Sequence, residues 1–288
     1  MHVPVLLKAA VEALHPLPGG IYVDATFGGG GHAGAIAAHL ELQGTRPGRL
    51  LAIDVDPTVA SDLPGVELVR GNFADLESIL DACGIEHVDG VLFDFGPSSA
   101  QFDRPERGFS FRADGPLDMR MDQSRGRTAA QLLEHSSESE LSLLFSRYGE
   151  ERVARRIARA IVAAREGGRA PRRTLELARL VAGVVHVQGR RERIHPATRV
   201  FQALRIAVND ELEAIRRGLT AATARTRPGA RIVAITFHSL EDRIVKHRFR
   251  DDERLHVITR RPIVPDAAEI ARNPRARSAK LRVAERSL

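Results

Sequence analysis

Short apolar stretches alternate with amphipathic segments over the first third of the chain. We expect strands at four continuously apolar stretches, residues 21–27, 49–56, 65–73 and 88–96. Residues 32–42 and 76–84 instead have the spacing of helices. Continuous apolar strands that alternate with helices are typical of a parallel sheet covered on both faces. Ligands bind such sheets beyond the carboxyl ends of the strands, so the polar residues that follow each strand are the candidates for a site.

The pattern changes between residues 109 and 196, where no strand is expected. Residues 150–168 and 169–187 predict two helices. The first has a basic face opposite its apolar stripe, formed by Arg152, Arg155, Arg156 and Arg159. On a single helix such a face is typical of a solvated surface. With the basic, turn-rich segment 188–196 that follows, the region predicts a helical insertion.

The last third of the chain returns to strands. Residues 198–219 carry one apolar stripe and predict a single long helix. Residues 231–237 predict a fifth buried strand. Two further short strands, at 255–264 and 279–285, have no long helix between them, so we expect an antiparallel pair at the edge of the sheet.

Together these elements predict an α/β fold. A Rossmann-like domain of residues 1–108 and 197–288 would contain a helical domain, residues 109–196, inserted between its fourth and fifth strands. No apolar run approaches the roughly 18 residues that a membrane span needs. We therefore expect no membrane partner. The single cysteine, Cys83, excludes an intramolecular disulfide, so we expect a cytoplasmic protein. The net charge of +6 permits a polyanionic partner without requiring one.

The glycine-rich segment 27–34 is the first candidate for ligand binding. Gly29, Gly31 and Gly34 match G-x-G-x-x-G, and Asp54 follows 20 residues later, as in a dinucleotide fingerprint. A structural turn is the alternative. No lysine or hydroxyl follows the glycines, which argues against a phosphate loop of the Walker type. Asp24, at the end of the preceding strand, would repel a pyrophosphate.

A ligand with an ammonium group and no phosphate suits this segment better. S-adenosylmethionine has an ammonium group from which Asp24 could accept a hydrogen bond. It also has a carboxylate that a helix N-terminus could face. Glycines let the backbone lie against its amino-acid portion. Asp54 is placed to accept hydrogen bonds from the two ribose hydroxyls, with a helix cap as the alternative role. Asp56, followed by proline, fits that cap position better and predicts a helix start.

Several blocks of the sequence are long and specific: HVPVLL, YVDATFGGGGH, AIDVDP, ERGFSFRADGPLDMRMD, YGEERVARRIARAIV, HPATRVFQALRIAVNDEL, FHSLEDRIVK and NPRARSAKLRVAER. From residue 2 to 287 they resemble the bacterial small-subunit (16S) ribosomal RNA cytosine-N4 methyltransferase family. The resemblance implies a class I, S-adenosylmethionine-dependent fold with an inserted helical domain, in agreement with the predicted layout. It also implies cofactor contacts at Gly30, Gly31, His32, Asp54, Phe73, Asp94 and Gln101. Phe73 would lie on the adenine, with a core aromatic as the alternative; for His32 the alternative is a helix cap.

The sequence departs from this family after the fourth strand. The family usually reads Asp-Leu-Gly-Val-Ser-Ser-Pro-Gln, whereas this chain reads DFGPSSAQ, with changes at Phe95, Pro97 and Ala100. Asp94 and Gln101 are retained, so we expect activity with a locally altered backbone. The segment between FHSLEDR and NPRARS is also short for the family. This argues against an RNA contact made by that segment.

The resemblance implies methyl transfer to a cytosine N4 amine, a weak nucleophile because its lone pair is delocalised into the ring. Asp94, Ser98 and Ser99 are candidate catalytic residues, since oxygen acceptors can hold the amine in line with the methyl group. The serines alternatively cap the next turn. His238, after the fifth strand, faces the cleft by topology. We expect no metal, because the transfer needs none and no metal-ligand spacing is present.

The implied partner is the RNA of the small ribosomal subunit or the particle itself, gripped by the helical insertion, since cationic faces bind phosphates. Monomer and homodimer remain open. A nicotinamide-dependent oxidoreductase is one alternative, against which Asp24 argues. A non-catalytic RNA-binding module is another, against which the set of cofactor residues argues. Methylation of another RNA base also stays open.

Overall fold

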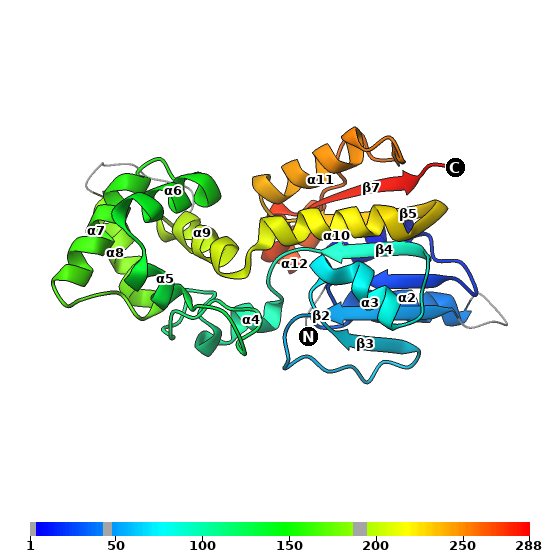
Figure 1. The fold of residues 1–288 in the computed structure, drawn as a ribbon, viewed down its shortest axis with the longest axis horizontal. Helices are drawn as coiled ribbons and strands as arrows, with labels where there is room; N and C mark the ends of the chain where they lie inside the picture. Colours follow the sequence, from blue (N-terminus) through cyan, green and yellow to red (C-terminus); the bar gives the residue numbers. More distant parts are fainter. Residues whose placement is uncertain (1–3, 43–47, 187–194) are drawn as a thin grey trace. The chain divides into compact units, whose positions relative to one another are not determined.

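The chain folds into two compact units. The structure, a computed structural model, describes residues 4–42, 48–186 and 195–288. We call Met1–Gly96 with Leu212–Leu288 the sheet unit, and Pro97–Glu211 the helical unit (Figure 1). The sequence analysis drew these boundaries at 109 and 196. Both boundaries lie further out, because Phe102 packs against the core of the helical unit and Phe201 and Leu204 are buried in that core.

The sheet unit is built on seven strands in the order β3-β2-β1-β4-β5-β7-β6 (Figure 1). The strands are β1 (Ile21–Asp24), β2 (Arg49–Asp54), β3 (Val66–Arg70), β4 (Val88–Asp94), β5 (Thr226–Thr236), β6 (Leu255–Val257) and β7 (Lys280–Arg286). The first five pair in parallel, and β7 is antiparallel to both β5 and β6. The predicted parallel sheet and its antiparallel edge pair are therefore confirmed. Strand β6 ends at Val257, well short of the predicted residue 264.

Alternate strand residues point to opposite faces of the sheet, and each face has its own core. Val23, Leu51 and Phe93 join one core, whereas Tyr22, Leu50 and Leu92 join the other. The first core is covered by α3 (Leu76–Ala82), α10 (Glu211–Arg225) and α11 (Ser239–Asp251). The second is covered by α1 (Leu7–Leu14), α2 (Gly31–Leu42) and the 3₁₀ turn η3 (Pro274–Ser278), and a short helix α12 (Ala267–Arg272) precedes η3.

The helical unit surrounds a separate core. Its helices are α4 (Ser99–Asp103), α5 (Ala129–His135), α6 (Glu138–Gly149), α7 (Ala154–Glu166), α8 (Thr174–His186) and α9 (Ala197–Asn209), with the 3₁₀ turn η2 at Pro105–Arg107. Thr128 and Ser137 begin α5 and α6 with capping boxes, which satisfy the first N–H groups of each helix. The predicted absence of strands between 109 and 196 holds for the described part of this range, where only an isolated bridge joins Pro116 to Arg173.

The single helix predicted for residues 198–219 is wrong. Helix α9 ends at Asn209, and Asp210 has a left-handed backbone with φ of 49° before α10 starts. Asp is among the few residues that adopt this conformation readily. The Asn209 amide donates to Met119 O and its oxygen accepts from Met121 N, so the break is held by side-chain bonds that an apolar stripe does not reveal.

Two further sequence predictions can be compared with the structure only over the residues that it describes. Most of the basic segment 188–196 lies outside them, since residues 187–194 are not described. Among the helices that are described, none is long and apolar enough to span a bilayer.

Candidate functional site

Three aspartates end neighbouring strands at the carboxyl edge of the sheet. Asp24 ends β1, Asp54 ends β2 and Asp94 ends β4. In the register of the sheet, Asp24 lies beside Ala52 of β2 and Leu92 of β4, so each neighbouring acid follows two residues later along its strand. The structure thus brings the predicted acids together at the edge where ligands bind such sheets.

Asp24 is fully buried, and one of its oxygens has no hydrogen bond. Oδ1 accepts from Thr26 N at 3.1 Å, whereas Oδ2 is buried without a hydrogen-bond partner among the residues described. Burial, together with the nearby charge of Asp54, raises the pKa of Asp24 to about 7, although the N–H groups of Thr26 and Ala33 act in the opposite direction. A buried carboxyl with a vacant acceptor oxygen fits a cationic donor such as an ammonium.

Asp94 has a similar environment. Its Oδ1 is buried and lacks a hydrogen bond within the described residues, although the side chain as a whole keeps 23% of its surface exposed. Its backbone N–H donates to Thr26 Oγ1 at 2.6 Å, which fixes the end of β4. Burial, with the charges of Asp24 and Glu241, raises the pKa of Asp94 well above its usual value. Asp94 therefore combines an acceptor oxygen that has no hydrogen bond with a side chain that is still partly exposed.

Asp54 holds the glycine loop. Its Oδ2 accepts from Gly28 N at 2.7 Å and its Oδ1 from Asp56 N at 2.8 Å. Burial raises the pKa of Asp54, while these two N–H groups lower it. Asp56 does not begin a helix as predicted, because it accepts instead from the backbone and hydroxyl of Thr58 in a turn.

Two glycines of the loop are required by the space around them. Gly30 has a φ of 73°, and a Cβ there would lie 2.8 Å from Phe27 Cζ. A Cβ on Gly31 would lie 2.1 Å from Pro4 Cγ. At Gly34, by contrast, a Cβ would make ordinary contact with Leu63 at 3.6 Å. The third glycine of the G-x-G-x-x-G match is thus not demanded by packing.

His32 is the second residue of α2 and does not cap it. Its ring is buried, with Nε2 at 3.0 Å from Val5 O and Nδ1 at 3.6 Å from Asp94 Oδ2. His32 thereby links the N-terminal segment to the acid at the end of β4. The helix-cap alternative is wrong, and cofactor contact at His32 stays a prediction.

Phe73 packs against the aromatic side of the core while remaining half-buried. Its ring lies edge-on to Phe93 at 5.8 Å and tilted to Phe95 at 5.5 Å. Gly218 makes room for it, since a Cβ there would lie 2.7 Å from Phe73 Cδ2. The unusual Phe95 is buried and stacks on Phe93 at 5.2 Å, so this departure from the family is accommodated by aromatic packing. The adenine contact of Phe73 stays a prediction.

Ser98, Ser99 and Gln101 belong to the helical unit. Ser98 caps α4: its Oγ accepts from Gln101 N at 3.3 Å, and Gln101 Oε1 accepts from Ser98 N at 3.0 Å. This is the capping role that the sequence analysis gave as the alternative for the serines. The catalytic roles of Ser98 and Ser99 and the cofactor contact of Gln101 stay predictions.

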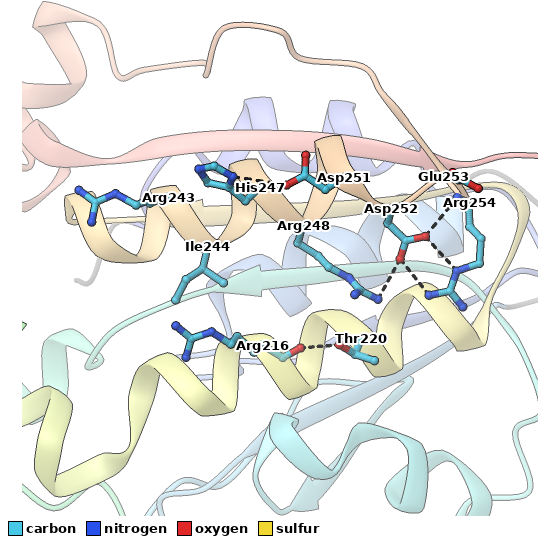
Figure 2. A pocket seen from close by; sticks show the side chains of 10 residues that line it. All are labelled: Arg216, Thr220, Arg243, Ile244, His247, Arg248, Asp251, Asp252, Glu253 and Arg254. Carbon is cyan, nitrogen blue, oxygen red and sulfur yellow. Dashed lines mark hydrogen bonds and ion pairs between the residues drawn. The ribbon is translucent and has the colours of Figure 1, made fainter.

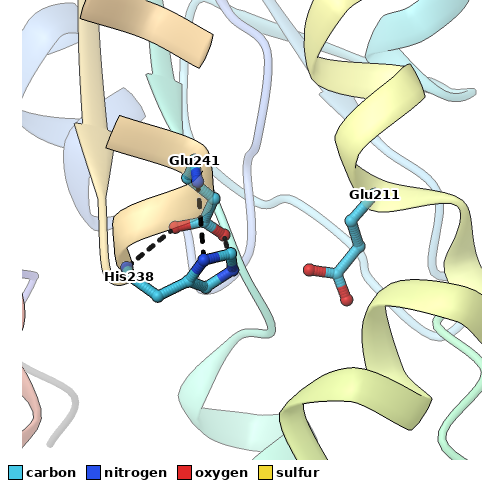
Figure 3. Close-up of side chains that lie close together, drawn as sticks. All are labelled: Glu211, His238 and Glu241. Carbon is cyan, nitrogen blue, oxygen red and sulfur yellow. Dashed lines mark hydrogen bonds and ion pairs between the residues drawn. The ribbon is translucent and has the colours of Figure 1, made fainter. Parts of the chain in front are cut away.

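The sequence analysis missed Glu241. Figure 3 shows its carboxylate beside the His238 ring at the start of α11. Glu241 is fully buried; Oε2 accepts from Phe237 N at 2.7 Å, and Oε1 lies 3.1 Å from His238 Nε2. His238 Nδ1 accepts from Glu241 N at 3.4 Å, which completes a capping box. A glutamate three residues after a cap position was the available signal, but histidine is an unusual cap.

Sheet order, the antiparallel β7, the row of acids and the glycine loop that opens into α2 define a class I methyltransferase dependent on S-adenosylmethionine. The buried, unbonded Oδ2 of Asp24 and the loop that admits no Cβ at Gly30 or Gly31 fit the ammonium and backbone-facing parts of this cofactor.

Comparison with known proteins names the family. Residues 1–287 match the MraW methylase family, and the chain belongs to it. The protein named ribosomal RNA small subunit methyltransferase H of Thermomicrobium roseum is 50% identical over 99% of this chain and 93% of its own. Its namesake from Aromatoleum aromaticum is 50% identical over 99% of this chain and 97% of its own. The predicted fold class and cofactor are thereby confirmed, and the oxidoreductase and non-catalytic alternatives are wrong.

Proposed function

We propose that this protein transfers a methyl group from S-adenosylmethionine to the exocyclic N4 of a cytidine in small-subunit ribosomal RNA, in the cytoplasm. The names of its relatives support the RNA substrate. The observation that supports an amine as the methyl acceptor is the buried, unbonded Oδ1 of Asp94, because it can accept a hydrogen bond from an N–H group at the sheet edge.

The sheet unit supplies most of the cofactor residues. Asp24 accepts from the ammonium, and Asp54 from the ribose hydroxyls. Gly30 and Gly31 let the backbone approach the amino-acid portion, as does the start of α2 at His32, and Phe73 lies on the adenine. Gln101, which belongs to the helical unit, is a further predicted cofactor residue. When bound, S-adenosylmethionine supplies an electrophilic methyl group on its sulfonium.

Asp94 orients the N4 amine and weakens its conjugation. A hydrogen bond from N4–H to Asp94 Oδ1 draws electron density toward nitrogen and fixes the direction of its lone pair. Because the pKa of Asp94 is raised well above its usual value, the same carboxylate is a better proton acceptor than an exposed one. The hydroxyl oxygens of Ser98 and Ser99 are further candidate acceptors for the amine hydrogens. Ser98 Oγ also accepts from Gln101 N, which caps α4.

The helical unit binds RNA through its arginine-rich helix α7. Arg155 and Arg159, with 78% and 62% of their side chains exposed, lie 3.8 and 3.5 Å from the same acid, Glu138. Two guanidinium groups beside one carboxylate leave an excess positive charge for phosphates. Arg165 on the same helix is not part of this face, since it donates to three carbonyls at the end of α5, those of Leu133, Glu134 and Ser136.

Small ribosomal subunits that lack the modification provide the test. They would be incubated with the protein and labelled S-adenosylmethionine, and the RNA digested for nucleoside mass spectrometry. We expect label on N4-methylcytidine, and loss of label with Asp94→Ala. Label on another nucleoside alone would support the alternative of a different target base, and absence of label from RNA would refute the proposal.

A further inference from the structure

A groove lined mostly by charged residues separates α10 and α11 on the sheet unit. Its volume is about 820 Å³, and its lining includes Arg216, Thr220, Arg243, Ile244, Arg248 and Asp252 (Figure 2). Helix α10 leads into β5 and α11 follows β5, so both helices have their N-terminal ends at the carboxyl edge of the sheet. The groove therefore runs away from the edge that holds Asp94.

The two ends of the groove differ in charge. At the far end the acids are compensated: Asp252 accepts from Arg254 and pairs with Arg248 at 2.9 Å, and Asp251 pairs with Arg250. The pKa of Asp252 is lowered to about 2, mainly by its hydrogen bonds from Arg254. These closed pairs leave little net charge there.

The near end has exposed arginines on both helices. Figure 2 shows Arg216 of α10 and Arg243 of α11 at the same end of the groove. Arg216 pairs with Glu213 at 3.3 Å, but more than half of each side chain is exposed. Such a surface pair contributes only about 0–1 kcal/mol, so a phosphate can replace the carboxylate.

This basic end begins close to the acid proposed to hold the target amine. Asp94 lies opposite Ile235 of β5 in the register of the sheet, and α11 begins at Ser239, four residues after Ile235, so α11 starts beside that acid. Arg243, the fifth residue of α11, is exposed. The phosphate backbone of an RNA strand whose target base reaches Asp94 would therefore lie at the near end of the groove.

We infer that the near end of this groove binds the phosphates of the RNA strand beside the target cytidine, through Arg216 and Arg243. The inference rests on the proposed function. Guanidinium groups bind phosphate oxygens in a bidentate manner. The described lining includes no Phe, Tyr or Trp, and the ring of its one histidine, His247, lies with Nδ1 3.4 Å from Asp251 Oδ2, so the contact is to the backbone and is independent of sequence. The acids at the far end limit the contact to the near end.

The test measures the salt dependence of RNA binding. The double variant Arg216→Gln/Arg243→Gln would be compared with Arg260→Gln/Arg261→Gln, which removes the same charge from two exposed residues of the sheet unit outside the groove. The probe is small-subunit ribosomal RNA that lacks the modification. Loss of two single-strand phosphate contacts should reduce the slope of log K against log salt by about 1.4 and weaken binding by about 20-fold at 0.1 M salt.

The expected result is this loss in the groove variant only, with unchanged affinity for S-adenosylmethionine, which shows that the sheet unit is intact. RNA affinity and slope equal to those of the unaltered protein would overturn the inference while leaving the proposed function standing. An equal loss in both double variants would also overturn it, since the effect would then be one of net charge. Failure of the unaltered protein to bind the RNA would overturn both proposals.

Discussion

His32 Nδ1 lies 3.6 Å from Asp94 Oδ2, while the other ring nitrogen of His32 lies 3.0 Å from the carbonyl oxygen of Val5. A carbonyl oxygen can only accept a hydrogen bond, so Nε2 of His32 carries a proton and donates it to Val5 O. The other ring nitrogen, Nδ1, faces the carboxyl group of Asp94. One buried ring thus connects the N-terminal segment to the proposed methyl-transfer centre.

Replacing His32 should affect both stability and cofactor binding. His32→Ala leaves the Val5 carbonyl without its donor, and an unsatisfied buried group costs about 1–3 kcal/mol. We expect a lower free energy of unfolding in denaturant titration and weaker S-adenosylmethionine binding in calorimetry. His39→Ala on the same helix is the control, and equal effects of the two substitutions would contradict the assignment.

The pKa of Asp24 predicts a pH-dependent stability. Its folded value of about 7 exceeds the ordinary 3.8, so the folded state holds the proton more tightly than the unfolded state between these values. The stabilisation is complete below pH 3.8 and is lost as pH rises toward 7, with an amplitude of about 4 kcal/mol. Asp24→Asn should flatten this dependence in the ligand-free protein and abolish cofactor binding. Parallel unfolding curves from pH 5 to 8 for the two proteins would refute this.

The glycine loop offers a matched pair of substitutions. Gly31→Ala places a Cβ 2.1 Å from Pro4 Cγ, so we expect a loss of about 1–3 kcal/mol in stability and impaired cofactor binding. Gly34→Ala meets only ordinary contact inside α2 and should be neutral or stabilising by up to about 1 kcal/mol. Thermal unfolding with and without S-adenosylmethionine distinguishes them. Equal behaviour would mean that the N-terminal segment moves aside.

Glu241 should tune the pH at which the enzyme works. Its charge helps to raise the pKa of Asp94, so Glu241→Gln should move the acidic limb of the kcat/KM profile to lower pH. Asp242→Asn is the contrasting variant: Asp242 pairs with Arg282 at 2.6 Å and Lys280 at 3.0 Å, so its loss should lower stability without moving the profile. An unshifted profile for Glu241→Gln would exclude this coupling.

The parts of the fold that sequence could predict are those governed by burial. The strands ending at Asp24, Asp54 and Asp94 are recognisable because continuous apolar runs stop at an acid, and parallel strands bring their carboxyl ends to one edge. The helix break at Asp210 was not predictable, because the apolar stripe continues on both sides of it. It depends on Asn209 bonding to Met119 and Met121, which are distant in sequence.

Within the candidate site, sequence reasoning found residues that follow strands and missed those fixed by tertiary contacts. Glu241 escaped because its importance comes from burial near Asp94, which the letters HSLE do not disclose. Thr26, which receives the Asp94 N–H, escaped for the same reason. The predicted cap at Asp56 failed because a short turn to Thr58 competed successfully with a helix.

Asp54, at the end of β2, has a structural role besides its proposed contact with the ribose, because its Oδ2 accepts a hydrogen bond from Gly28 N. An acid expected to meet the ribose already constrains the loop expected to meet the amino-acid portion, so the two halves of the cofactor cradle are set in place before the ligand arrives. Less conformational entropy is then lost when the ligand binds. An Asp54→Ala substitution would accordingly release the loop as well as delete a contact, and the measured loss of affinity would exceed that of a ribose hydrogen bond alone.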